Sequence, residues 1–195
     1  MKVSRALLAD MRSFADDFTP LAVEHRDEPF TSYWMENGLM LQRAGSLMLQ
    51  HAAALRLGFD VVAGNGAGGR IFATSMIMVP AEDGNNRLSS AWLNNDHKDT
   101  DTIDGYGVHG ARVGGERTLL VGDIAGSDGS QISSINMLRK AGAIVTDALW
   151  LCLADQSGGR AAEALSAIDV NLRWLFDFDE SNGLFRPAAH LLEAT

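Results

Sequence analysis

Apolar residues recur along this chain in two patterns, one typical of amphipathic helices and one typical of buried strands. Near the amino terminus, Leu7, Met11 and Phe14 share one helical face, which predicts a helix over residues 3–18 that ends before Pro20. Further helices are expected at residues 44–57, 130–141, 160–167 and 184–194, and one could begin within 69–74. Apolar runs predict strands at residues 33–41, 59–63, 75–79, 87–93, 119–121, within 143–155 and at 171–178.

The alternation of strands and helices predicts the fold class. Strands separated by helices form a mostly parallel sheet with helices on both faces, so the sequence predicts a single α/β domain over residues 1–195. Residues 94–116 do not fit the alternation, because they are polar and Gly-rich and contain no convincing element. A loop of this length in a compact domain is usually functional or mobile, so we expect a flexible loop there.

Composition and charge narrow the class of protein. Hydrophobic residues make up 46% of the 195 residues, enough for a full core, and the net charge is -9. An acidic chain without a basic face argues against nucleic acid as a partner, and no apolar run approaches the ~20 residues of a membrane span. The amphipathic, acid-containing amino terminus is unlike a signal peptide. The lone Cys152 and His51 are expected to pack against apolar neighbours, and a reducing, cytoplasmic setting is expected.

The segment 118–142 carries the clearest chemical signal. An apolar run ends in Gly122 and Asp123, a small polar loop follows at residues 126–130, and a helical pattern begins directly after it. Such a unit points backbone N–H groups and the positive end of a helix dipole at one place, where a phosphate fits. The carboxylate of Asp123 could accept hydrogen bonds from a sugar diol beside that phosphate. An ordinary Gly-rich turn, with Asp123 capping the loop, would give the same pattern.

This segment resembles the motif with which type I phosphoribosyltransferases bind phosphoribosyl pyrophosphate (PRPP), where a strand ending in acids leads into a Thr/Ser/Gly loop. Three further segments resemble orotate phosphoribosyltransferases in the same order. Residues 32–45 resemble the early strand and helix, 58–69 the pyrophosphate-binding loop, and 143–160 the strand after the PRPP helix. The resemblance covers roughly residues 32–176 and implies the type I phosphoribosyltransferase fold. It also implies a homodimer that uses Mg²⁺ and transfers ribose 5-phosphate from PRPP to a nitrogenous, pyrimidine-like base, with release of pyrophosphate.

The resemblance also assigns roles to individual residues. Asp123 matches the acid that contacts the ribose hydroxyls, so it would be catalytic and would share in holding Mg²⁺. Lys98 in the long loop aligns with a lysine that meets the departing pyrophosphate. The 5′-phosphate is implied to bind Gly126, Ser127, Asp128, Gly129 and Ser130. The pyrophosphate is implied to bind Asn65, Gly66, Ala67 and Gly68, and the base is implied to bind Gln156. The implied ligands are PRPP and a small base or nucleoside monophosphate.

Several positions depart from the family pattern. The first acid is replaced by Gly122, a loop glycine by Asp128, and a basic pair in the long loop by Asn94 and Asn95. An early lysine that meets orotate has no counterpart, and Gln156 replaces an arginine, although orotate is a carboxylate that suits a fixed cation. Two other interpretations therefore stay open. One is a non-catalytic or repurposed relative that acts by binding a nucleotide or a partner, and the other is an unrelated doubly wound nucleotide-binding protein.

Overall fold

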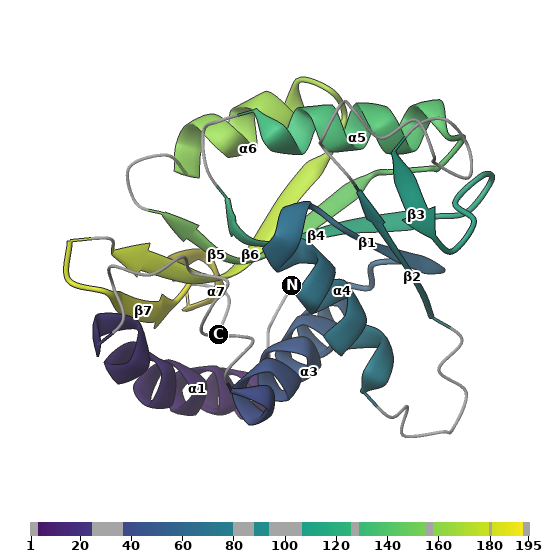
Figure 1. The fold of residues 1–195 in the computed structure, drawn as a ribbon. Helices are drawn as coiled ribbons and strands as arrows, with labels where there is room; N and C mark the ends of the chain where they lie inside the picture. Colours follow the sequence, from purple (N-terminus) through teal and green to yellow (C-terminus); the bar gives the residue numbers. More distant parts are fainter. Residues whose placement is uncertain are drawn as a thin grey trace.

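Seven strands form one sheet with helices on both faces (Figure 1). The computed structural model describes residues 4–24, 37–79, 88–93, 107–125, 129–154, 158–179 and 181–192. The strands are β1 (Val61–Gly64), β2 (Ser89–Leu93), β3 (Val108–Gly110), β4 (Thr118–Ala125), β5 (Asp147–Ala154), β6 (Asn171–Asp179) and β7 (Leu184–Pro187). The helices are α1 (Arg5–Glu24), α3 (Gly38–Ala54), α4 (Gly66–Met78), α5 (Ser130–Lys140), α6 (Gly158–Ser166) and α7 (Ala189–Leu192).

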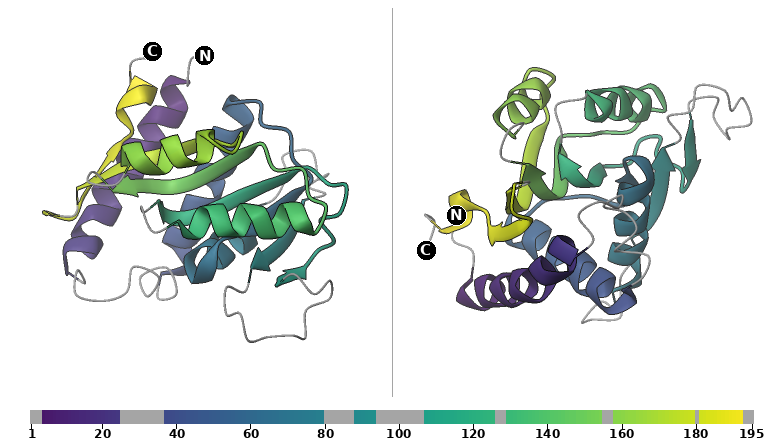
Figure 2. Two further views of the ribbon diagram at one scale, coloured as in Figure 1. Left: turned by 90° about the horizontal axis from the view of Figure 1, so that it is seen from above. Right: turned by 60° about the vertical axis from the view of Figure 1, so that its left-hand side comes forward.

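The sheet has the order β3-β2-β1-β4-β5-β6-β7, in which only the two edge strands β3 and β7 run antiparallel to their neighbours. Helices α1, α3 and α4 cover one face of the sheet and α5 and α6 cover the other, where they lie side by side (Figure 2). Each face has its own apolar core, and strands buried on both sides explain the continuous apolar runs in the sequence. The predicted α/β class with a mostly parallel sheet is confirmed.

The order in which the chain adds strands to the sheet reverses between β1 and β4. From β1 the chain moves outward to β2, and it later returns to β4 on the other side of β1. The helix after β1 (α4) therefore covers one face, while the helix after β4 (α5) covers the opposite face. A crevice forms outside the carboxyl ends of strands at such a switch point, and this is where ligands bind in open α/β sheets. The fold thus directs attention to the ends of β1 and β4.

The amino-terminal helix is longer than predicted, because α1 runs to Glu24 and contains Pro20. Aromatic packing beside the proline accounts for the difference. The ring of Phe18 meets Phe185 edge to face at 4.9 Å, and Phe14 stacks on Phe176 at 5.3 Å. These contacts hold α1 to β6 and β7, so the loss of one helical hydrogen bond at a proline does not end the helix.

Two predicted strands are wrong because their residues are helical. Residues 38–41 of the strand predicted at 33–41 begin α3, and its earlier residues lie outside the described part. The strand predicted at 75–79 is the last turn of α4. A short apolar run suits a buried helix as well as a strand. Tertiary packing decides here: Ser75 donates a hydrogen bond to the Leu41 carbonyl at 2.8 Å, and a Cβ at Gly45 would collide with Ser75.

Both edge strands were missed in the sequence. β3 lies inside the stretch 94–116 that was expected to hold no element, and β7 lies where a helix was expected at 184–194. β3 has three residues and β7 four, so neither is long enough to show an alternating pattern, and each forms by pairing with a neighbour. Within the described ranges no helix is long and apolar enough to cross a membrane.

Candidate functional site

Asp123 and the loop at residues 65–68, both predicted to bind PRPP, meet at the switch point. Asp123 projects from the end of β4 toward the first turn of α4, where a Cβ at Gly68 would collide with its carboxylate. A Cβ at Gly69 would collide with the Val121 carbonyl, so the helix turn lies directly on β4. Glycine is needed at both positions because the backbone comes too close for a side chain. The structure therefore brings Asp123 and residues 65–68 together.

A second contact joins Asn65, the residue before α4, to helix α5. The hydroxyl of Ser134 in α5 donates a 2.5 Å hydrogen bond to the Asn65 side-chain oxygen, and both groups lie at the edge between β1 and β4. Asn65 precedes α4 but makes no capping hydrogen bond to it, because its side chain turns to Ser134 instead. The N–H groups of the first turn of α4, from Gly66 to Gly68, thus have no intrahelical acceptor. They form a ready donor set for an anion.

Asp123 is a carboxylate taken partly out of water. Burial raises its pKa above the ordinary value of 3.8, and the backbone N–H groups of Ile124 and of Asp123 itself offset this only in part. Its backbone carbonyl accepts a weak hydrogen bond from the Cys152 thiol at 3.4 Å. Hydrogen bonds from a ligand hydroxyl to this carboxylate would offset part of the cost of burying its charge.

The fold explains why position 122 is a glycine: there is no space for a side chain. In the parallel register, Gly122 of β4 lies opposite Trp150 of β5, and a Cβ at Gly122 would collide with the indole. Trp150 is completely buried, so it cannot swing aside. The indole therefore fills the space that a side chain at position 122 would need, where the resembling family has an acid. Of the two positions, only Asp123 carries a carboxylate here.

The phosphate loop is described only at its end. Gly129 has a φ of +74°, the left-handed conformation that favours glycine, and it precedes α5 without a side-chain cap. Ser130 begins α5, so the predicted loop–helix junction is present. The other predicted site residues lie outside the described part of the chain: Lys98, Gly126, Ser127, Asp128 and Gln156.

The donor set around Asp123 suits Mg²⁺ only in a limited way. Among the described residues no group of three His, Cys, Asp or Glu side chains could hold a metal ion. Mg²⁺ is, however, often held by one or two carboxylates, with water and substrate phosphates completing its shell. Asp123 can supply one such carboxylate, so the residues fit a metal that arrives with its substrate rather than one held by the protein alone.

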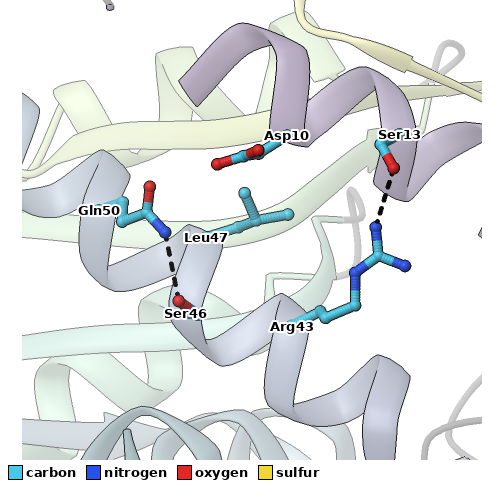
Figure 3. A pocket seen from close by; sticks show the side chains of 6 residues that line it. All are labelled: Asp10, Ser13, Arg43, Ser46, Leu47 and Gln50. Carbon is cyan, nitrogen blue, oxygen red and sulfur yellow. Dashed lines mark hydrogen bonds between the residues drawn. The ribbon is translucent and has the colours of Figure 1, made fainter. Parts of the chain in front are cut away.

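Hollows lined by described residues lie apart from this carboxylate. One of about 180 Å³ lies between α1 and α3, where Arg43 donates to Ser13 and Gln50 donates to Ser46, both at 3.2 Å (Figure 3). Another of about 240 Å³ runs between α5 and α6 and has a mostly apolar lining that includes Ile132 and Leu165. Neither is lined by Asp123 or by residues 65–68. Four of the polar side chains that line the first hollow bond one another in these two pairs.

Two residues that shape the site were missed in the sequence. Ser134 lies one turn inside α5, where a serine carries no signal, and only the tertiary structure brings it to Asn65. Trp150 is completely buried in the core. Its effect on Gly122 depends on the strand register, and the sequence alone does not give that register.

Solved structures share this fold. Orotate phosphoribosyltransferase of Mycobacterium tuberculosis H37Rv, crystallised with PRPP, matches with a TM-score of 0.70 at 19% identity, over 87% of this chain and 89% of the other. A phosphoribosyltransferase from Corynebacterium diphtheriae matches with a TM-score of 0.70 at 20% identity, over 88% and 98% of the two chains. The fold is therefore that of the type I phosphoribosyltransferases, as the resemblance in the sequence implied.

Sequence similarity is confined to a shorter stretch. The orotate phosphoribosyltransferase of Methanospirillum hungatei is 42% identical over 60 residues, which make up 31% of this chain and 33% of that protein. The match spans about a third of the curated relative's length. No protein-family model matches the chain. The chain thus has the phosphoribosyltransferase fold, while its substrates have to be argued from the site.

Proposed function

We propose that this chain binds PRPP in the crevice between β1 and β4 and transfers its ribose 5-phosphate to a nitrogenous base. The observation that carries this proposal is the contact between the Asp123 carboxylate and Gly68. It puts an acceptor for the ribose hydroxyls beside the N–H groups that would receive the pyrophosphate. The 5′-phosphate would bind at the other helix start, where residues 126–130 lead into α5.

In the proposed reaction the bond from ribose C1 to a pyrophosphate oxygen breaks, and a bond from C1 to a base nitrogen forms. Asp123 would accept hydrogen bonds from the ribose diol and so hold the sugar in place while C1 moves between the two partners. The N–H groups of Gly66, Ala67 and Gly68 would meet the negative charge that grows on the pyrophosphate. Mg²⁺, when bound by Asp123 and substrate oxygens, would supply further positive charge to the leaving group.

A specific observation also favours a second candidate function. The indole of Trp150 leaves room only for glycine at position 122, so this fold cannot hold a second acid there without rearrangement. A relative that binds PRPP or a nucleoside monophosphate without turnover needs fewer catalytic groups. We therefore keep a non-catalytic binding protein as the alternative, and the two candidates differ in whether pyrophosphate is released.

The test is a pyrophosphate-release assay with PRPP, Mg²⁺ and a panel of purine and pyrimidine bases, run beside a calorimetric titration of PRPP. The proposal expects PRPP binding and release that depends on at least one base. Binding without release for every base would favour the non-catalytic candidate. Absence of both would contradict both candidates.

We further propose a homodimer, working in the cytoplasm, on the strength of the family resemblance. Sedimentation equilibrium checks the first part. A mass near twice the 21.0 kDa of the chain would support the dimer, and a mass equal to it would contradict the dimer without affecting the proposed PRPP site.

A further inference from the structure

An exposed arginine lies next to the proposed pyrophosphate loop. Arg70 is in the second turn of α4, and helical side chains lean toward the amino terminus of their helix, which here is the end facing the crevice. Its guanidinium carbon lies 5.4 Å from the centroid of the Trp92 ring. Trp92 is the penultimate residue of β2 and pairs with Gly64, which directly precedes the loop at residues 65–68. The cation is therefore held beside that loop.

The aromatic ring beneath Arg70 is itself fixed. His109 of β3 pairs with Trp92 in the sheet, and the two rings stack at 5.8 Å with planes 13° apart. The neighbouring Gly110 has a φ of +90°, and a Cβ there would lie 3.1 Å from the indole, so glycine leaves the space that the ring needs. A guanidinium resting on a fixed aromatic face loses less conformational entropy when it binds an anion.

Arg70 differs from Arg43, Arg117 and Arg139, whose guanidinium groups are already bonded within the protein. Arg43 and Arg117 each pair with a carboxylate, at 2.7 and 3.1 Å, and Arg139 donates to two backbone carbonyls. The Arg70 guanidinium has no hydrogen-bond or ion-pair partner among the residues that the structure describes. Its cation–π contact uses the face of the guanidinium and leaves the N–H groups at its edge able to donate.

We propose, given the PRPP site proposed above, that Arg70 is the cation that binds the pyrophosphate group of PRPP. A planar guanidinium recognises phosphate oxygens with two parallel N–H bonds, which suits a group bound at the adjacent helix start. The chain carries a net charge of -9, so a multiply charged anion needs a local cation. In this role Arg70 would substitute for the basic pair of the resembling family, at whose positions this sequence has Asn94 and Asn95.

Calorimetric titrations with two fragments of PRPP test this role. Inorganic pyrophosphate with Mg²⁺ probes the Arg70 side of the crevice, and ribose 5-phosphate probes the Asp123 and 126–130 side. Arg70→Ala should weaken pyrophosphate binding about ten-fold to a hundred-fold and leave ribose 5-phosphate binding unchanged. Arg70→Lys, which keeps the charge but loses the planar fork, should fall between wild type and Arg70→Ala.

Two further variants separate the role of Arg70 from a general charge effect. Trp92→Leu should weaken pyrophosphate binding a few-fold, because the guanidinium loses its support. Arg112→Ala is the matched control: Arg112 is also exposed, but it follows β3, whose antiparallel pairing carries the chain away from the carboxyl end of β2. This control should bind both fragments like wild type.

Each contrary result has a distinct meaning. If Arg70→Ala binds pyrophosphate as tightly as wild type, the role of Arg70 is overturned while the proposed PRPP site stands. If Arg70→Ala weakens both fragments equally and lowers the melting temperature, Arg70 is structural and the proposal is also overturned. If wild type binds neither pyrophosphate nor PRPP, the proposed function fails together with this inference.

Discussion

At the scale of single residues, Asp123 shows a conflict between stability and binding. Burial raises the pKa of its carboxyl, so the folded protein holds this proton more tightly than the unfolded chain does. The unfolded chain loses this proton near pH 3.8, while the folded protein keeps it to a higher pH. The free energy of unfolding therefore falls as pH rises from about 3.8 through the raised pKa, and it changes no further with this group above that pKa. The charged form that a ligand needs is thus the form that the fold tolerates less well.

Asp123→Asn should therefore affect ligand and fold in opposite directions. It should weaken PRPP binding by roughly 1.5–3 kcal/mol, because the diol loses a charged acceptor. It should leave the melting temperature of the ligand-free protein at pH 7 unchanged or raise it, because the buried charge is gone. Calorimetry and thermal denaturation measure the two effects, with exposed Asp10→Asn as control. Unchanged PRPP affinity would remove Asp123 from the site.

We expect His51 to make the folded protein less stable at acidic pH. It is fully buried in α3, and neither ring nitrogen has a hydrogen-bond partner among the described residues. Burial, assisted by the positive charges of His190 and Arg173, lowers its pKa from 6.5 to about 4. Between these values the unfolded chain binds a proton that the folded protein excludes, so stability falls as pH falls from about 6.5 to about 4.

His51→Leu, which nearly conserves volume, should remove this part of the acid response. Over that pH range wild type should lose on the order of 3 kcal/mol more unfolding free energy than His51→Leu, since one pKa unit corresponds to about 1.4 kcal/mol. Urea denaturation at several pH values measures the difference, and His109→Gln should follow wild type. Parallel curves for wild type and His51→Leu would show that another group controls the acid response.

At the scale of elements, burial of His51 and Cys152 could be expected from the sequence, because each lies in an apolar pattern.

The pairing of β4 with β5 determines which residues can form the site. The loss of the acid at position 122 could be seen in the sequence but not explained. Its cause is the indole of Trp150, which reaches Gly122 only through the register of two parallel strands.

Restoring the family's acid should therefore damage the fold. Gly122→Ala should lower the unfolding free energy by about 1–3 kcal/mol, because its Cβ meets a buried ring. Gly122→Asp should lower it further, since a carboxylate is buried as well. Urea denaturation measures both. Gly114→Ala is the control, because its Cβ meets only the Ala141 carbonyl at 3.4 Å. Stable Gly122→Asp protein would contradict the steric explanation.

At the scale of the whole molecule, the alternation of strands and helices predicted the mostly parallel sheet, which is confirmed. Parallel strands send the loops that follow them to the same edge, and this explains why residues 65–68 after β1 meet Asp123 of the neighbouring β4. The sequence could not show which strand pairs with which. It also could not reveal the stack of Arg70, Trp92 and His109, because these residues come from three elements far apart in the chain.

The base side of the site gives a prediction about specificity. Gln156 stands where the resembling family has an arginine, and that family's early lysine has no counterpart in the sequence, so orotate should be a poor substrate, or none, in the proposed reaction. A pyrophosphate-release assay that compares orotate with neutral pyrimidines and purines measures this. Gln156→Arg should improve the use of orotate relative to neutral bases. Efficient turnover of orotate by wild type would mean that another cation serves its carboxylate.

We propose that PRPP binds across the crevice between β1 and β4, and a crystal structure of the protein with PRPP and Mg²⁺ would decide this. We expect the ribose hydroxyls at the Asp123 carboxylate, the pyrophosphate at the N–H groups of Gly66 to Gly68, and the 5′-phosphate at the start of α5. PRPP bound elsewhere, or no bound PRPP at saturating concentration, would refute the proposed site.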